Sequence, residues 1–430
     1  MTAALVLTVL VSTNTWNPLP QLAGWWEKVT RMSDPEPAWT TRLGGVPDMA
    51  AVTITGQVVL ASRGLVDGYD RGSGRLLWHH DADWALPAVD VVVIRPRPEG
   101  RDTDNQPDTG YSVVDPINGT VLWGDREAIA VWAYGDLILD LVCPASGDCR
   151  LRARAHRPDG QLRWAVPLPA SARTITGPNP ALAATRAPAD WFRPAAAGSP
   201  GPLPAVIGVP LDGRIHIVDT VEGRHVREVT PPDRQTRVVV AGEHLLYVHS
   251  EPAESSCRFR VEAVDHRTGS SLWRQEGLDL DTAGGGGCDA RSDPLGTRNH
   301  LIATRADNHP ALISVDDGRA IWVGVPGERI LDTDGQLAVV ETADRKTLRV
   351  VDLLAAEPVE VWSGEVGPRP RAAVTRDYVL IAGAERLVVL GHLGAATLAT
   401  VRTKASVVGY GLRGLILASA RKIGFLPLPY

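Results

Sequence analysis

The sequence lacks the short motifs that identify several common enzyme classes. Its 430 residues contain no Gly-x-Ser-x-Gly elbow, no Cys-x-x-Cys pair and no glycine-rich loop followed by Lys and Ser or Thr. These absences argue against a serine-hydrolase elbow, a cysteine-ligated zinc site and a phosphate-binding loop. A long basic stretch is also missing, and 44 Lys and Arg face 50 Asp and Glu. We therefore expect no nucleic-acid partner.

Phenylalanine is scarce, whereas tryptophan is abundant, with 3 Phe against 13 Trp. Six Trp residues end copies of one pattern, such as VDGYDRGSGRLLW at 66–78, in which an apolar run leads to a Gly-containing turn and a second apolar run. The six are Trp78, Trp123, Trp164, Trp273, Trp322 and Trp362. Two further copies, around Asp219 and Gly394, keep the spacing without the Trp. Self-similarity of this kind predicts a repeat architecture.

Each copy predicts a β-hairpin. In the first copy Asp70 begins the turn, Gly74 supplies the positive φ that such a turn needs, and Trp78 ends the second strand. Another apolar run precedes each copy, for example at 52–62 and 334–342, so that each repeat holds about four strands. Four-stranded units repeated around a ring form a β-propeller, in which we expect each motif Trp to pack on the next blade. The six Trp residues are therefore assigned a structural role and no ligand.

This pattern resembles the repeat of the PQQ-like, or quinoprotein-like, propellers over about residues 39–430. The resemblance implies an all-β fold of eight four-stranded antiparallel blades, plus or minus one. PAWTTRL, around Trp39, resembles an outer strand, and residues 414–428 resemble two inner strands. We therefore expect the terminal strands to pair and close the ring.

Some propellers of this family are dehydrogenases that hold PQQ over a Ca²⁺ ion. Those enzymes show adjacent cysteines and a set of Glu, Asn and Asp around the cofactor; here no two cysteines are adjacent, and no matching acidic set is found. We expect no cofactor and favour a non-enzymatic binding or assembly scaffold. The repeat also resembles the family of the outer-membrane assembly lipoprotein, although no lipobox Cys follows the N-terminus. A quinone- or metal-dependent dehydrogenase with its ligand in the central funnel is the alternative.

The N-terminus suggests a membrane location. Residues 1–11, MTAALVLTVLV, are uncharged and mostly apolar, but a bilayer-spanning helix needs about twenty residues. We interpret this segment as the outer end of a membrane anchor that starts upstream, followed by a linker at 12–38 and the propeller at 39–430. A soluble N-terminus that happens to be apolar is the alternative.

The four cysteines fall as two natural pairs, Cys143 with Cys149 and Cys257 with Cys288. We predict two disulfides, and hence an oxidising compartment, with zinc as the weaker explanation. Together with the N-terminal segment, the disulfides place the expected propeller outside the cytoplasm on a single anchor in the cell membrane.

Two further segments are candidate sites. The first is an acidic run that offers oxygen ligands for Ca²⁺ but lacks the Gly and the terminal Glu of an EF-hand loop: Asp102, Asp104 and Asp108. A solvated loop explains this run equally well. The second is an insertion at 177–204, rich in Pro and Ala, whose Trp191 and Phe192 are candidate anchors for a protein partner in the cell envelope. In the alternative interpretation, these two aromatic residues fold back over a blade.

Overall fold

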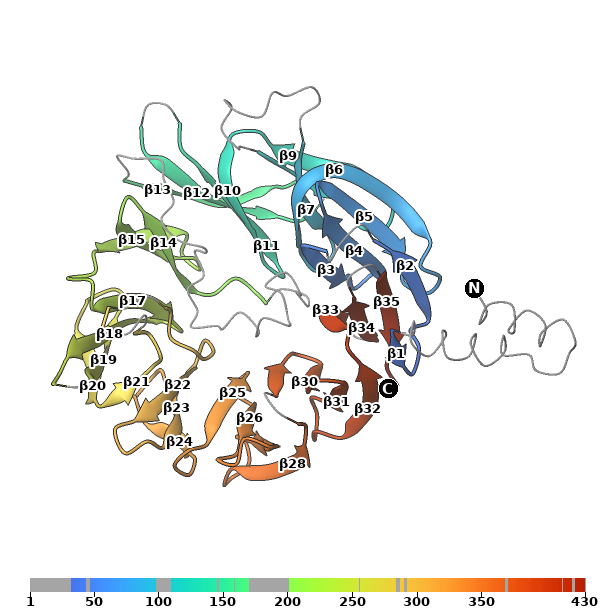
Figure 1. The fold of residues 1–430 in the computed structure, drawn as a ribbon. Coiled ribbons are helices and arrows are strands. Elements are labelled where there is room, and N and C mark those ends of the chain that lie inside the picture. The colour runs from blue at the N-terminus through green and yellow to red at the C-terminus, as the bar shows by residue number, and fades with distance from the viewer. Residues whose placement is uncertain are drawn as a thin grey trace, which may run out of the picture.

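The computed structural model describes residues 32–43, 47–97, 110–144, 147–157, 159–169, 201–254, 256–283, 287–289, 292–367, 370–411, 413–419 and 422–429. Every regular element in these ranges is a β-strand, and all strand pairs are antiparallel (Figure 1). The predicted all-β class is therefore confirmed. The described strands form eight hydrogen-bonded sheets, most of them four-stranded.

The sheets follow the chain order. The first has seven strands, β3 (Met49–Val52), β4 (Gln57–Ser62), β5 (Leu65–Asp70), β6 (Leu76–Pro87), β7 (Val92–Pro96), β8 (Tyr111–Val114) and β9 (Val121–Asp125). It consists of two four-stranded meanders that share the long strand β6. A four-stranded sheet follows, with β10 (Ala128–Ala133), β11 (Leu137–Val142), β12 (Cys149–Ala155) and β13 (Leu162–Leu168). The next sheet has three described strands, β14 (Val206–Leu211), β15 (Arg214–Asp219) and β16 (Arg224–Val229).

The remaining sheets complete the series. Three have four strands each: β17 (Thr236–Ala241), β18 (His244–Pro252), β19 (Cys257–Asp265) and β20 (Ser271–Glu276); β21 (Leu278–Asp279), β22 (His300–Arg305), β23 (Pro310–Ser314) and β24 (Ala320–Val323); and β25 (Arg329–Thr333), β26 (Leu337–Glu341), β27 (Thr347–Asp352) and β28 (Val359–Glu365). A five-stranded sheet contains β29 (Arg371–Val374), β30 (Tyr378–Ala382), β31 (Arg386–Gly391), β32 (Thr397–Thr403) and β1 (Ser33–Asp34). The last sheet joins β33 (Ser406–Gly411), β34 (Gly414–Ala418) and β35 (Lys422–Pro427) to β2 (Trp39–Arg42).

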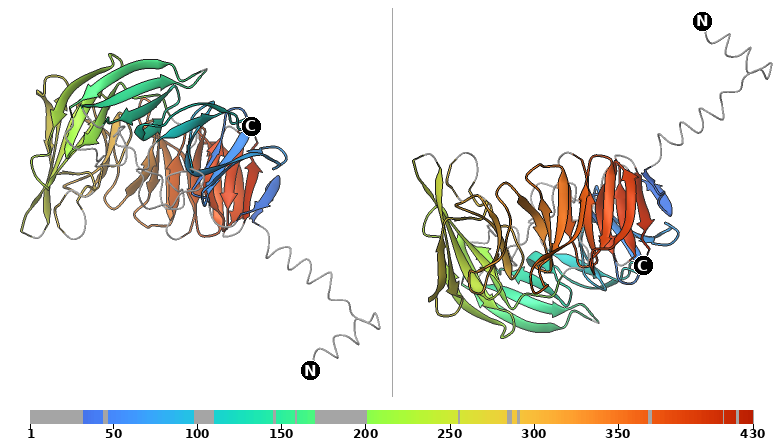
Figure 2. Two further views of the ribbon diagram at one scale, coloured as in Figure 1. Left: turned by 90° about the horizontal axis from the view of Figure 1, so that it is seen from above. Right: turned by 90° about the horizontal axis from the view of Figure 1, so that it is seen from below.

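Buried apolar side chains join each unit to the next around a ring (Figure 1). One cluster, for example, unites Leu151 of β12 with Ile207 of β14. Another unites Leu60 of β4 with Phe425 of β35, so that the first unit packs against the last. Seen edge-on in Figure 2, the later sheets stand side by side, whereas the sheets near β10–β20 are tilted relative to them. Burial of apolar surface between neighbouring sheets is the main stabilising term in such an architecture.

The two ends of the described chain meet in the same sheets. Strand β2 pairs with β35, and Trp39 lies opposite Phe425. Strand β1 pairs with β32, where Ser33 lies opposite Thr403. The expected pairing between the segment around Trp39 and residues 414–428 is thus present, and it covers the outer edges of the last two sheets.

Four of the six motif Trp residues lie against the Gly of the next turn and form a recurring joint between neighbouring units: Trp78, Trp123, Trp164 and Trp273. The indole Nε1 of Trp78 donates a hydrogen bond to the carbonyl oxygen of Pro116, 2.8 Å away in the next turn. Gly119 of that turn lies against the ring: its φ is +75°, and a Cβ there would come within 2.7 Å of the Trp78 side chain. Glycine is therefore required both by the backbone conformation and by the indole. We call this arrangement the Trp joint.

Trp39 makes the same joint across the two ends of the chain. Its Nε1 donates to the carbonyl oxygen of Arg71 at 2.6 Å, and Gly74 of the first copy lies against its ring. The indole also stacks with Tyr69 and with Phe425, whose ring centroids are 6.3 Å and 6.5 Å away. Trp39 is therefore the motif Trp of the last unit, and it ties that unit to the first.

Candidate functional site

The motif Asp residues stabilise their own turns. The Asp265 carboxylate accepts hydrogen bonds from the backbone N–H groups of Thr268 and Arg267, at 2.6 and 2.9 Å. These bonds, with that from the Thr268 hydroxyl, hold the pKa of Asp265 below its usual range. At Asp219 burial acts to raise the pKa, but backbone N–H groups and Arg267 outweigh it, and the pKa is lowered. These carboxylates are ionised turn caps, which is a structural role.

The same turns carry exposed aliphatic side chains. In four copies the residue two positions after the start of the turn is aliphatic and at least half exposed: Ile117 at 50%, Val221 at 79%, Leu354 at 69% and Leu393 at 84%. Each of these turns leads into the last strand of a meander, namely β9, β16, β28 or β32, so that all four lie at the same end of the strands. We call the surface around these four residues the turn face.

A buried ionic network lies inside the sheet β10–β13. Asp140 is fully buried, and its carboxylate accepts hydrogen bonds from Nε of Arg152 at 2.5 Å and from Nε of Arg154 at 3.0 Å. The hydroxyl of Tyr111 donates to the same carboxylate at 2.7 Å, and burial together with the Asp140 charge raises the pKa of this Tyr. Both oxygens of Asp140 accept hydrogen bonds, so this network links the sheet β10–β13 to strand β8.

Both predicted disulfides are present. Cys143 and Cys149 join the end of β11 to the start of β12, with an S–S distance of 1.98 Å. Cys257, at the start of β19, is bonded to Cys288 with an S–S distance of 2.00 Å. The chain therefore has no free thiol.

Several sequence candidates lie outside the described residues, namely Asp102, Asp104, Asp108, Trp191, Phe192 and the apolar segment 1–11. Their predicted roles stay predictions. Among the described residues, none forms a helix long and apolar enough to cross a membrane.

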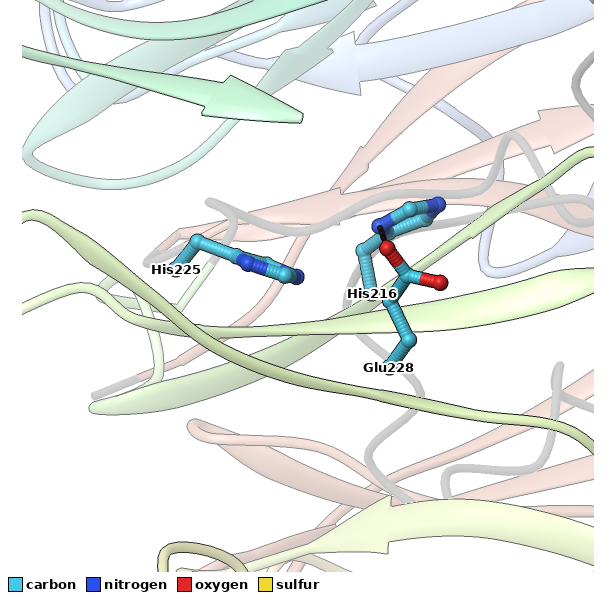
Figure 3. A group of neighbouring side chains, drawn as sticks. All are labelled: His216, His225 and Glu228. Atoms are coloured by element: carbon cyan, nitrogen blue, oxygen red, sulfur yellow. Dashed lines mark ion pairs between the residues drawn. The ribbon is translucent and has the colours of Figure 1, made fainter. Parts of the chain in front are cut away.

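A second cluster, which the sequence patterns did not predict, lies on the sheet β14–β16. His216 of β15 and two residues of β16, His225 and Glu228, each offer one ligand atom, and these three atoms lie within 4.8 Å of one another (Figure 3). His216 is fully buried, and neither of its ring nitrogens has a hydrogen-bond partner among the described residues. Burial lowers the pKa of both His216 and His225, which favours neutral imidazoles at neutral pH.

A β-bulge explains why strand alternation did not reveal this cluster. His225 and Glu228 are three residues apart, so a regular strand would point them to opposite faces. The pairing shifts between Ile217 and Val218, which places His225 directly opposite Val218, while Glu228 stays opposite His216. The bulge therefore brings both side chains to the face that carries His216.

Comparison with known proteins supports the assignment of the repeat. Residues 258–408 match the family model described as outer membrane protein assembly factor BamB. The predicted resemblance to PQQ-like propellers is confirmed. A comparison with curated proteins gives no match.

Three solved structures are similar to this chain at low sequence identity. BamB from Moraxella catarrhalis is 15% identical, with 90% of this chain and 98% of that chain covered and a TM-score of 0.39. The quinohemoprotein alcohol dehydrogenase from Comamonas testosteroni is 12% identical, with 90% and 75% covered and a TM-score of 0.40. A eukaryotic initiation factor is 9% identical, with 92% and 94% covered and a TM-score of 0.51. At these identities the similarity concerns the fold alone.

Proposed function

We propose that the chain is a non-enzymatic, extracytoplasmic scaffold that binds a protein partner in the cell envelope through its turn face. The observation that carries this proposal is the repeated exposure of aliphatic side chains at one turn position, most strongly at Leu354 and Leu393. Single exposed apolar residues are ordinary, but their recurrence at one end of four units, of which the last two are neighbours, provides a spaced series of anchors on a rigid support.

The matched family model adds support, because its description names a protein assembly factor. The structural roles of the polar and aromatic residues also support a non-enzymatic function. The Trp side chains form joints, the motif Asp carboxylates cap turns, and Asp140 accepts hydrogen bonds from two arginines. We further propose that Trp191 and Phe192 contribute anchors to the same partner.

The proposed location rests on the two disulfides, which persist in oxidising compartments. We propose that residues 1–11 are the outer end of a membrane anchor, with the linker at 12–38 and the ring at 39–430. The ring is then a β-propeller. Dividing the seven-stranded sheet at β6 makes nine units, the upper end of the predicted eight plus or minus one.

The decisive experiment is site-specific photocrosslinking of the full-length protein in its native host. A photoreactive residue is placed at Leu354 or at Leu393, and the matched control is Val325, which is 56% exposed. Val325 lies in the link between β24 and β25, at the opposite end of the strands from the turn face. We expect one envelope protein to crosslink from the turn face and not from Val325.

Charge substitution provides a second test of the turn face. Leu354→Glu and Leu393→Glu together should lower recovery of that partner at least tenfold, because each buries a carboxylate at the interface. Equal crosslinking from both faces, or unchanged recovery in the double variant, contradicts the proposal. Titration with PQQ and Ca²⁺, followed by Trp fluorescence, tests the dehydrogenase alternative; saturable stoichiometric binding would favour it.

A further inference from the structure

We propose that His216, His225 and Glu228 bind one Zn²⁺ ion, which links β15 to β16. This site does not depend on the proposed scaffold function. Its three ligands come from two paired strands and converge on one point of the sheet face (Figure 3).

The burial of His216 is the first argument. Its side chain is fully buried, yet both Nδ1 and Nε2 lack a hydrogen-bond partner among the described residues, as does Nε2 of His225. A buried polar group without a partner is destabilising, and native structures rarely leave one in place without a reason. Coordination to a metal ion removes this cost at the nitrogen that becomes a ligand.

The arrangement of Glu228 is the second argument. Nη1 of Arg214 donates a hydrogen bond to Oε2 of Glu228 at 2.6 Å, and Oε1 lies 3.9 Å from Nδ1 of His216. One carboxylate oxygen is thus held in place while the other is directed at the imidazole. A partner that orients a ligand in this way is a regular feature of protein metal sites.

The ligand set favours a transition metal, and Zn²⁺ is a common occupant of such a set. Two imidazoles and one carboxylate are the donors of many Zn²⁺ sites, which leave a fourth position for water or another ligand. Ca²⁺ and Mg²⁺ prefer a shell of oxygen atoms, and copper(I) prefers sulfur. Ligand atoms around tetrahedral Zn²⁺ lie about 3.3 Å apart. The three atoms here lie within 4.8 Å of one another, so binding would draw them closer together.

The position in the ring gives the site a structural role. In β16, the outer strand of the sheet β14–β16, Arg227 occupies the position at which most copies carry the motif Trp. The Arg227 guanidinium lies against Gly269 of the next turn, but an arginine buries less apolar surface than an indole. A metal link between β15 and β16 would reinforce a sheet that lacks this aromatic anchor.

The test uses the full-length oxidised protein without a histidine tag. Zn²⁺ affinity and stoichiometry are measured by competition with a chromophoric zinc chelator, and Co²⁺ is then added to record the visible spectrum of the site. We expect one Zn²⁺ per chain in the wild type. His225→Gln and Glu228→Gln should weaken binding at least tenfold and abolish the Co²⁺ spectrum.

The matched control is His79→Gln. His79 occupies in the first copy the position that Glu228 occupies here, and it pairs with Asp67 as Glu228 pairs with His216. Leu76 stands in the place of His225, so that pair has no third ligand. His79→Gln should bind Zn²⁺ as the wild type does. Absence of stoichiometric binding in the wild type, or wild-type affinity in both His225→Gln and Glu228→Gln with unchanged circular dichroism, overturns the proposal.

Discussion

Replacement of Trp39 by Ala tests whether the ends of the chain close the ring. The substitution removes the hydrogen bond to the Arg71 carbonyl oxygen and the stacking with Tyr69 and Phe425. Truncation of a fully buried aromatic side chain costs about 3–5 kcal/mol. Trp39 is half-buried, so we expect a loss of about 2–3 kcal/mol in the free energy of unfolding, a large part of the roughly 5–15 kcal/mol that a folded domain possesses.

The same variant should loosen the strand that Trp39 begins. Strand β2 is hydrogen-bonded to β35 alone among the described strands, and Arg42 at its end offers a trypsin site. Urea unfolding followed by circular dichroism measures the free energy, and limited proteolysis measures cleavage after Arg42. We expect a lower urea midpoint and faster cleavage at Arg42 in Trp39→Ala.

Two controls separate the contribution of the hydrogen bond, and that of the joint between the chain ends, from a general loss of stability. Trp39→Phe keeps a ring but loses the hydrogen bond, and should cost about 1 kcal/mol. Trp123→Ala removes an internal joint, in which Nε1 donates to the His156 carbonyl oxygen at 2.8 Å. It should lower stability comparably without favouring cleavage at Arg42. If Trp39→Ala left both the urea midpoint and the Arg42 cleavage rate unchanged, the joint between the chain ends would not stabilise the ring.

Three further predictions follow from the described contacts. Asp140→Asn should lower the free energy of unfolding in urea by about 2–3 kcal/mol, because it removes the fully buried carboxylate that accepts from Arg152 and Arg154 and leaves them paired with Asp125 alone; an unchanged midpoint would argue against the network. The pKa of Asp265 is lowered in the folded state, so its stabilising effect is complete above the unfolded pKa near 4 and is lost as pH falls through the lower folded value. Thermal melting between pH 7 and pH 2 should show this loss, with a shallower acid limb in Asp265→Asn. Replacing both cysteines of the bridge at Cys257 by Ser should cost about 3–4 kcal/mol, and of the bridge at Cys143 about 2 kcal/mol, since their sequence separations are 31 and 6. Equal losses in urea unfolding would contradict the loop-entropy argument.

The local elements could be predicted from the sequence because their determinants are close together along the chain. The Asp, the Gly and the second apolar run of a copy lie within about a dozen residues, and turn chemistry plus strand alternation act over that distance. The hairpin from Asp70 to Trp78 is therefore evident in the sequence, and so are the two cysteine pairs. The match to the family model concerns this same repeat.

The tertiary structure decided what depends on distant or irregular pairing. Trp39 has no motif turn beside it in the sequence, because the strands that complete its unit lie at the other end of the chain. Strict strand alternation would place His225 and Glu228 on opposite faces of the sheet. The bulge that brings them to one face depends on the pairing of β15 with β16. The local sequence pattern determines that the chain forms β-hairpins that end on Trp. The closure of the ring and the His–Glu cluster arise only when strands with long chain separation or shifted register are brought side by side.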